Sequence, residues 1–204
     1  MSDVIEVESR VLLSSEQRDD MLSFMSTLGE VKTISRVMVD FSGKDRSRTV
    51  VLRVNNGTLE LVAKTGKLSD VVRHEAQLSL SSSVSLENAL HWLAIMGYTE
   101  AMVSLRKMFV VRTKELEYSL RDVLAQDLRR ASTLLEVEVL NVKNGTEQAA
   151  VAKVNNALRV HGLIPLSAKE WEGWVKRTYD EVDQPFKYSP EAVKALSTSL
   201  DRMN

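Results

Sequence analysis

Polar and apolar side chains alternate along most of the first two-thirds of the chain. Because successive side chains of a strand point to opposite faces, this two-residue period predicts β-strands. In the first such stretch Glu6, Glu8 and Arg10 share one face, and apolar residues occupy the other. The predicted strands are Val4–Leu12, Lys32–Phe41, Thr49–Val54, Thr58–Lys64, Val72–Leu80, Ala101–Arg112, Glu115–Val123 and Leu134–Val142.

Apolar residues at a spacing of three or four predict helices between and after these strands. The predicted helices lie between Ser14 and Gly29, between Leu86 and Gly97, around Val151 to Leu158, after Ser167 and after Ser189. Ser167 and Glu170 form a capping-box pattern, and we expect Trp171 and Trp174 to pack in a core. The pattern predicts an α+β fold, with the helices packed outside a barrel or a highly curved sheet. We expect one domain over residues 1–182 and a helical extension over 183–204 that packs on the same domain.

Composition excludes several classes of function. The net charge of -1 gives no overall signal for binding nucleic acid or an acidic membrane. The chain has no cysteine, which excludes disulfides, thiolate catalysis and cysteine-ligated metals. We find no secretory signal at the start of the sequence and no apolar run of the roughly 20 residues that a membrane span needs, so we expect a cytoplasmic protein.

The polar faces of the predicted strands carry an unusual number of charges. Carboxylates and cations recur on strand after strand, as in Arg53, Lys64, Arg73, Glu75, Arg106, Arg112, Glu117, Arg121, Glu136 and Glu138. If the strands close into a barrel with helices outside, these charges line its interior. A charged interior is costly unless its charges neutralise one another or a ligand. Carboxylates that bind a hard cation, together with arginines and lysines that bind phosphate oxygens, fit that requirement. The simpler alternative is a sheet with its charged face in solvent.

The order of these segments resembles the CYTH superfamily, the triphosphate tunnel metalloenzymes. Glu6-Val7-Glu8-Ser9-Arg10 is similar to the family's N-terminal Glu-x-Glu-x-Lys strand, with Arg10 in place of lysine. Further similarities are the basic hairpin of Arg53 and Lys64, the Arg73-His74-Glu75 strand, the basic strand with Arg106, and the closing Leu135-Glu136-Val137-Glu138. Arg121 stands where the family has an acidic residue.

This resemblance implies an eight-stranded antiparallel β-barrel, or tunnel, that binds a triphosphate with Mg²⁺ or Mn²⁺. It implies catalytic roles for Glu6, Glu8 and Arg10. It assigns phosphate binding to Arg10, Arg53, Lys64, Arg73 and Arg106, and metal binding to Glu6, Glu8, Glu136 and Glu138.

Hydrolysis of an inorganic, nucleoside or thiamine triphosphate is the reaction that we expect. Cyclisation of ATP, as in class IV adenylyl cyclases, uses most of the same groups and stays open. So do a non-catalytic triphosphate- or polyphosphate-binding module and a β-barrel carrier with solvated charges. The expected partner is a small molecule that carries a triphosphate, and a nucleic acid would be bound only through a 5′-triphosphate end. The sequence leaves a homodimer open.

Overall fold

The computed structural model describes residues 4–41, 48–65, 71–143 and 145–203, and for a few of these, including Glu6 and Arg73, it describes only the backbone. Within these ranges the chain forms nine strands and five helices. The strands are β1 (Val4–Leu13), β2 (Lys32–Asp40), β3 (Arg48–Asn55), β4 (Thr58–Thr65), β5 (Val72–Ser79), β6 (Glu100–Arg112), β7 (Leu116–Leu124), β8 (Arg130–Val142) and β9 (Gln184–Lys187). The helices are α1 (Ser15–Leu28), α2 (Leu86–Ile95), α3 (Glu147–Arg159), α4 (Ala168–Glu181) and α5 (Pro190–Met203).

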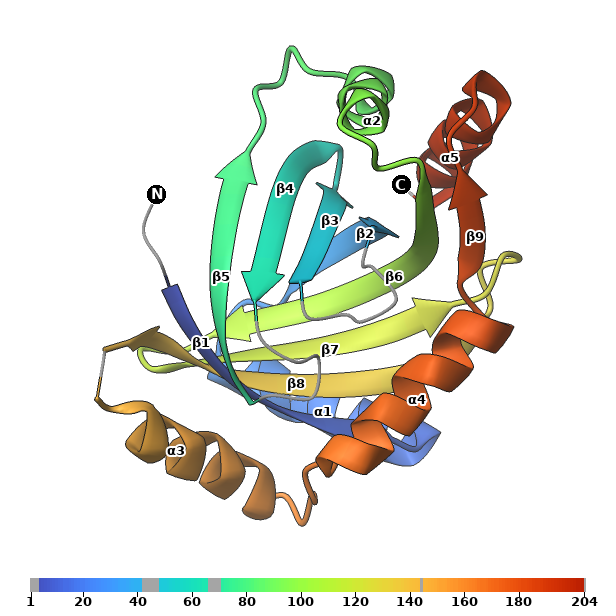
Figure 1. Cartoon of the computed structure of the whole chain (residues 1–204). Coiled ribbons are helices and arrows are strands. Elements are labelled where there is room, and N and C mark those ends of the chain that lie inside the picture. Colours follow the sequence, from blue (N-terminus) through green and yellow to red (C-terminus); the bar gives the residue numbers. More distant parts are fainter. Residues whose placement is uncertain (1–3, 42–47, 66–70, 144, 204) are drawn as a thin grey trace.

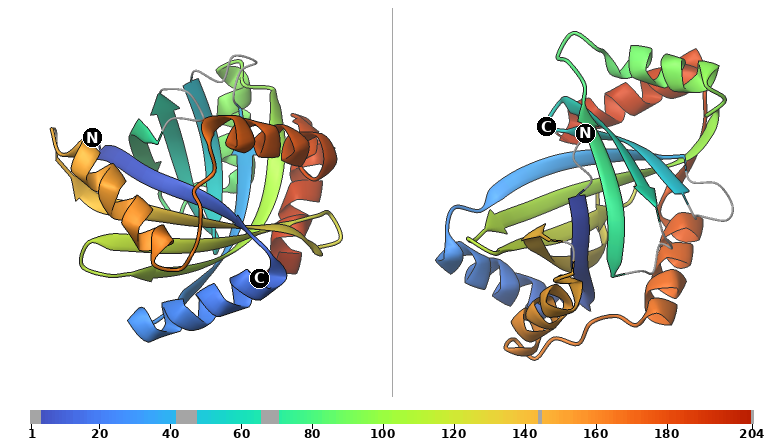
Figure 2. Two further views of the ribbon diagram at one scale, coloured as in Figure 1. Left: turned by 90° about the horizontal axis from the view of Figure 1, so that it is seen from below. Right: turned by 60° about the vertical axis from the view of Figure 1, so that its left-hand side comes forward.

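Eight of the described strands form a closed circuit of antiparallel pairings. Their order is β2-β3-β4-β5-β1-β8-β7-β6, and β6 pairs back with β2. The closing ladder runs from the Lys32–Val110 pair to the Asp40–Met102 pair. Figures 1 and 2 show this circuit as a strongly curled sheet around a central space. The predicted fold class, α+β with an eight-stranded antiparallel barrel, is therefore confirmed.

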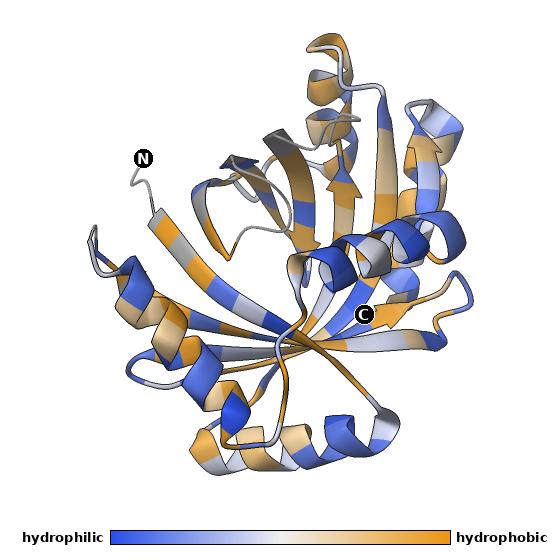
Figure 3. Cartoon of the chain, turned by 60° about the horizontal axis from the view of Figure 1, so that its bottom comes forward, coloured by the Kyte–Doolittle hydropathy of each residue, from blue (hydrophilic) through white to orange (hydrophobic). Residues whose placement is uncertain are grey.

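Helices α1 and α3 cover one outer side of the curled sheet. Met25 of α1 and Val154 of α3 pack with Val7, Leu120 and Leu135, all of them fully buried. These strand residues are the apolar members of the two-residue alternation, and Figure 3 shows that alternation along the strands as changes between hydrophilic and hydrophobic colour. The apolar strand faces therefore point outward to the helices, which leaves the polar faces to line the interior.

Helices α2 and α5 cover a second outer side. Leu90 of α2 and Leu196 of α5 join a buried cluster with Val37, Leu52 and Leu105. The short strand β9 leads into α5 and pairs with β6, from Glu100–Lys187 to Val103–Gln184. None of the described helices combines the length and the apolar character that crossing a bilayer requires.

Helix α4 differs from the other four described helices because it lies at one end of the ring (Figure 1) and packs against inward-facing strand residues. Trp171 and Trp174 stack on each other, with ring centroids 4.9 Å apart, and pack against Val123 and Leu134. The two tryptophans are buried, as expected from their helical spacing. The backbone N–H of Leu166, just before the helix, donates to the carbonyl of residue 10 at 2.8 Å. Helix α4 thus forms one end wall of the interior.

Candidate functional site: a charged tunnel

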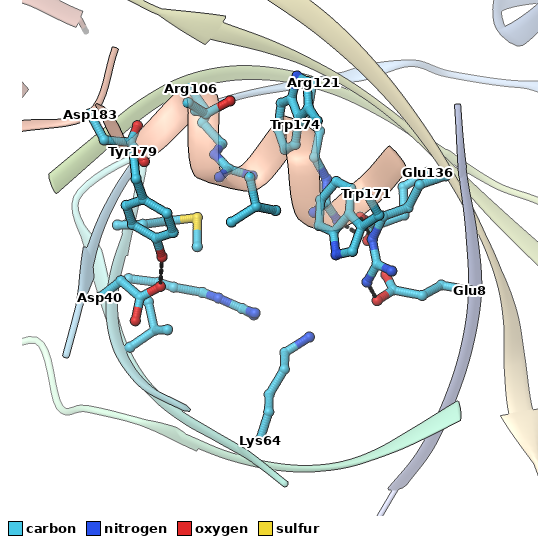
Figure 4. A pocket seen from close by; sticks show the side chains of 16 residues that line it. Glu8, Asp40, Lys64, Arg106, Arg121, Glu136, Trp171, Trp174, Tyr179 and Asp183 are labelled. Carbon is cyan, nitrogen blue, oxygen red and sulfur yellow. Dashed lines mark hydrogen bonds and ion pairs between the residues drawn. The ribbon is translucent and has the colours of Figure 1, made fainter. Parts of the chain in front are cut away.

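The interior of the ring contains two adjoining cavities. The larger, of about 490 Å³, lies between the strands, and the smaller, of about 90 Å³, lies under α4. Arg53, Lys64 and Arg121 line both, so the two cavities are parts of one tunnel. Figure 4 shows the end near α4, with Asp40, Tyr179 and Asp183 on one side and Glu8, Glu136 and Trp171 on the other.

Seven cationic side chains line this tunnel from six different strands, counting the described residues alone. They are Arg10 of β1, Arg36 of β2, Arg53 of β3, Lys64 of β4, Arg106 and Arg112 of β6, and Arg121 of β7. The alternation of each strand places them on the polar face, and the closure of the ring turns those faces toward one another. Four of the five predicted phosphate-binding residues, Arg10, Arg53, Lys64 and Arg106, are therefore brought together.

Arg73, the fifth, has a side chain that lies outside the described residues, as does that of Glu6. The backbones of these two residues are partners in the β1–β5 ladder.

Carboxylates neutralise part of the charge along β1, β8 and β7. Glu8 and Arg10 form a close ion pair, and Arg10 Nε lies 3.4 Å from a carboxylate oxygen of Glu136. Arg121 binds the other oxygen of Glu136 at 2.6 Å. The guanidinium of Arg10 also lies 4.5 Å from the ring centroid of Trp171. Because Glu8 and Glu136 are almost completely buried, their charges would be very costly without these arginines.

A second set of contacts lies on the facing wall. Lys64 Nζ is 2.6 Å from one oxygen of Glu75, and Arg53 Nη1 is 3.6 Å from the other. The buried Nε of Arg53 has no hydrogen-bond partner among the described residues. The carboxylate of Glu75 thus contacts two cations of this wall.

Arg36 and Arg106 carry positive charge that is not offset by a close ion pair among the described residues, although carboxylates line other parts of the same tunnel. Burial, followed by repulsion from Arg53, Arg121 and Arg106, holds the pKa of Arg36 well below its usual range. Burial also lowers the pKa of Arg106, against the attraction of Asp183. Within the described part of the chain, neither arginine has a carboxylate within 4.0 Å. An anion placed among these guanidinium groups would relieve their repulsion.

Arg36 donates from Nε to Oδ1 of Asn55 at 2.6 Å. That bond fixes the side chain but leaves its charge in place. Arg36 could not be recognised from the sequence pattern, because its inward-facing neighbours Ile34 and Met38 are apolar and hide the polar face of β2.

The predicted metal ligands have different surroundings. Glu8 and Glu138 are direct partners in the β1–β8 ladder, and Glu117 is the partner of Glu138 in the β7–β8 ladder, so three carboxylates lie in a row across neighbouring strands. The described residues include no group of three or more acidic or histidine side chains already arranged around an ion position. Glu136 is held by Arg10 and Arg121 and would have to leave them to reach a metal.

Glu8 and Glu138 nevertheless offer the oxygen ligands that Mg²⁺ and Mn²⁺ prefer. Mg²⁺ commonly uses one or two carboxylates and completes its shell with substrate phosphates and water. The residues present therefore fit an ion that arrives with its substrate better than a permanently held ion.

Arg121 and Asp122, which are adjacent in the sequence, point in opposite directions. Arg121 faces the tunnel, whereas Asp122 faces outward, where it binds Arg18 at 2.7 Å and Thr133 at 2.7 Å. Asp122 therefore cannot supply the acidic side chain that Arg121 replaces. The tunnel gains a cation at a position where the resemblance implied an anion.

Comparison with known proteins supports the fold but no closer relationship. No protein-family model and no curated protein matches the chain. Among solved structures, the PH1819 protein of Pyrococcus horikoshii has a TM-score of 0.62 at 18% identity, covering 85% of this chain and 99% of that one. A candidate adenylate cyclase from Vibrio parahaemolyticus has a TM-score of 0.57 at 13% identity, covering 96% and 99%.

A third neighbour is HpAC1 of Hippeastrum, described as a candidate adenylyl cyclase with a dominant triphosphatase activity. It has a TM-score of 0.50 at 14% identity, covering 79% of this chain and 89% of its own. At these identities the likeness concerns the fold alone. Two of the three neighbours carry the adenylyl cyclase description that the sequence resemblance had implied, and the chain has a CYTH-like fold.

Proposed function

We propose that this protein binds a triphosphate in its tunnel and hydrolyses it with the help of a divalent metal ion. The observation that carries the proposal is the convergence of cations from six strands of the described ring, two of them without a carboxylate within 4.0 Å among the described residues. A tripolyphosphate carries its negative charge along a short chain, which matches cations spaced along a tunnel better than a single cluster.

In the proposed reaction the tunnel cations position the triphosphate. Arg36 and Arg106, which are partners in the β2–β6 ladder, would hold phosphate oxygens together with Arg53, Lys64 and Arg121. Water attacks the terminal phosphorus, the bond from that phosphorus to the bridging oxygen breaks, and the products are orthophosphate and the shortened phosphate chain. The cations contribute by neutralising negative charge on the transferred phosphoryl group.

Glu8 and Glu138 are the residues that we propose to hold Mg²⁺ or Mn²⁺, and Glu6 is a further candidate from its position on the same strand. A bound ion would add charge neutralisation on the phosphoryl group. One of these carboxylates would also orient the attacking water and accept its proton.

Binding without turnover is a second candidate, favoured by a specific observation. Glu136, one of the implied metal ligands, is held between Arg10 and Arg121, and Glu8 is paired with Arg10. If these ion pairs persist when a triphosphate is bound, the tunnel is a metal-independent anion site. Cyclisation of ATP, with release of pyrophosphate, would use the same cations and is tested together with hydrolysis.

The test measures phosphate release from inorganic triphosphate, ATP and thiamine triphosphate with Mg²⁺, Mn²⁺ or a chelator, and pyrophosphate and cyclic product from ATP. Hydrolysis predicts metal-dependent release that Glu138→Gln abolishes and that Lys107→Ala leaves intact. Lys107 is a matched control because it lies next to Arg106 in β6 but faces solvent.

Calorimetry with each triphosphate separates the remaining outcomes. Binding that needs no metal, with no product from any substrate, would establish the binding-only alternative. Cyclic product from ATP would replace hydrolysis by cyclisation. No binding of any triphosphate by a folded protein would overturn the proposed function altogether.

A further inference from the structure

Asp183 is an acidic residue in the tunnel wall that comes from outside the ring. It follows the last residues of α4, where its N–H donates to the carbonyl of Thr178 at 2.8 Å. The next residue, Gln184, begins β9 and pairs with Val103 of β6. The end of α4 and the start of β9 therefore hold Asp183 against β6, and its side chain lines the smaller cavity (Figure 4).

The neighbours of Asp183 connect it to the phosphate-binding cations. From β6, the hydroxyl of Ser104 forms a hydrogen bond with Asp183, and Arg106 Nε donates to the same hydroxyl oxygen at 3.1 Å. From β2, Asp40 adds a second negative charge, and from α4 the hydroxyl of Tyr179 donates to Asp40. One buried oxygen of Asp183 has no hydrogen-bond partner among the described residues.

These surroundings make the charge of Asp183 easy to change. Burial raises the pKa of Asp183 to about 6, Asp40 acts in the same direction, and Arg106 and Ser104 oppose the shift. A carboxylate with this pKa exchanges its proton near neutral pH rather than in acid. A phosphate bound at Arg106 would add a further negative charge next to it and would raise the pKa again.

We propose that Asp183 competes with a bound phosphate group for Arg106, so that triphosphate binding is coupled to uptake of a proton by Asp183. This inference rests on the proposed binding of a triphosphate in the tunnel, but it does not require hydrolysis or a metal. It makes Asp183 a residue that tunes the affinity of the site through Arg106.

The coupling fixes how affinity depends on pH. Asp183 has a pKa of about 6 in the free protein and a higher pKa in the complex. At a pH between these two values, binding of the phosphate makes Asp183 take up a proton. The affinity therefore increases as the pH falls from alkaline values toward 6, and the gain is complete below that. Each unit by which binding raises the pKa of Asp183 corresponds to about a tenfold gain in affinity.

The experiment is calorimetry of inorganic triphosphate binding, in a chelator, with buffers of different ionisation enthalpy, from pH 5.5 to 8. The change Asp183→Asn removes the charge but keeps an oxygen that can accept from Ser104, so Arg106 keeps its hydrogen-bond partner. The ligand's own titration is the same for every variant and cancels in the comparison. Asp180→Asn is the matched control, because Asp180 lies three residues before Asp183, in the last turn of α4, but is exposed to solvent.

We expect the wild type and Asp180→Asn to take up more protons on binding near pH 7 than Asp183→Asn does. We also expect Asp183→Asn to bind up to about tenfold more tightly than the wild type at pH 8 and equally well near pH 5.5. Equal proton uptake and parallel pH dependence in all three proteins would overturn the coupling while leaving triphosphate binding in place. Absence of binding at every pH would instead overturn the proposed function, and the coupling with it.

Discussion

Arg36 carries a charge that we propose to bind phosphate, although its repulsion by other arginines destabilises the protein without a ligand. Its guanidinium is repelled by three other arginines, and its hydrogen bond to Asn55 does not neutralise it. We expect Arg36→Met to weaken triphosphate binding at least about tenfold, because hydrogen bonds to charged groups are worth roughly 1.5–3 kcal/mol. The unfolding free energy should stay within about 1 kcal/mol of the wild type, because removing the repulsion offsets the lost bond to Asn55.

Calorimetry and chemical denaturation of the same variant check both parts of this prediction, with Lys107→Ala as the solvent-facing control. A variant that binds triphosphate as well as the wild type does would remove Arg36 from the site. A large loss of stability with unchanged binding would make its role structural.

Replacing Asp122 is expected to lower stability without changing triphosphate binding, which is the opposite of the effect expected for Arg36. It faces outward, is 5% exposed, and binds both Arg18 and Thr133. Asp122→Ala leaves Arg18 with one carboxylate fewer and Thr133 without an acceptor, so it should cost about 2–3 kcal/mol of stability. Triphosphate affinity should be unchanged. Urea denaturation and calorimetry measure the two effects, and a weakened affinity at full stability would contradict the outward orientation.

At the scale of elements, α4 joins the core to the site. Trp174 is buried with Trp171 against the inward-facing Val123 and Leu134, and it lines the smaller cavity together with other residues of the same helix. We expect Trp174→Ala to lower the free energy of unfolding by about 3–5 kcal/mol, because a large buried ring is lost. We also expect faster amide hydrogen exchange over Ala168–Glu181, since the helix loses its main contact with the ring.

Glu172 provides the control on the same helix, because it is exposed, and Glu172→Ala should change stability by no more than about 0.5 kcal/mol. Hydrogen exchange measured by mass spectrometry locates the effect. If Trp174→Ala accelerated exchange throughout the chain and not chiefly in α4, the helix would be part of the global folding unit.

Most elements could be predicted from the sequence because their signals are local. The two-residue alternation located all eight strands of the ring, and capping residues such as Ser14 and Ser167 located helix starts. The β9–β6 pairing could not be predicted, because β9 has only four residues and its partner lies far away in the sequence.

A residue of the tunnel could be predicted from the sequence where its charge lay on the polar face of a strand with alternating polar and apolar residues. Arg36 was hidden by apolar neighbours, and Asp183 lies after the region of family resemblance. The sharing of Glu136 by Arg10 and Arg121 depends on the lateral register of β1, β8 and β7, which no local pattern specifies.

For the whole molecule, the balance of interior charge predicts how ligands affect stability. Inorganic triphosphate at 100 times its dissociation constant should add about 2.7 kcal/mol of stability, with or without a chelator. For a protein of this size the corresponding rise in melting temperature is roughly 5–10 °C. The chelator alone should not lower the melting temperature, because arginines and lysines already pair with the interior carboxylates. Thermal melts test both statements, and a melting temperature lowered by the chelator would indicate a resident ion.

The position of β1 in the ring determines when the ring can close during synthesis. This strand precedes both of its partners, β5 and β8, in the sequence, and β8 begins only at Arg130. At translation rates of about 5–20 residues per second, β1 waits on the order of ten seconds for its second partner. Until then Glu8 and Arg10 are exposed at an unpaired strand edge, where a chaperone can bind. The charged interior therefore forms only after β8 has been made, when most of its opposing charges are already in the chain.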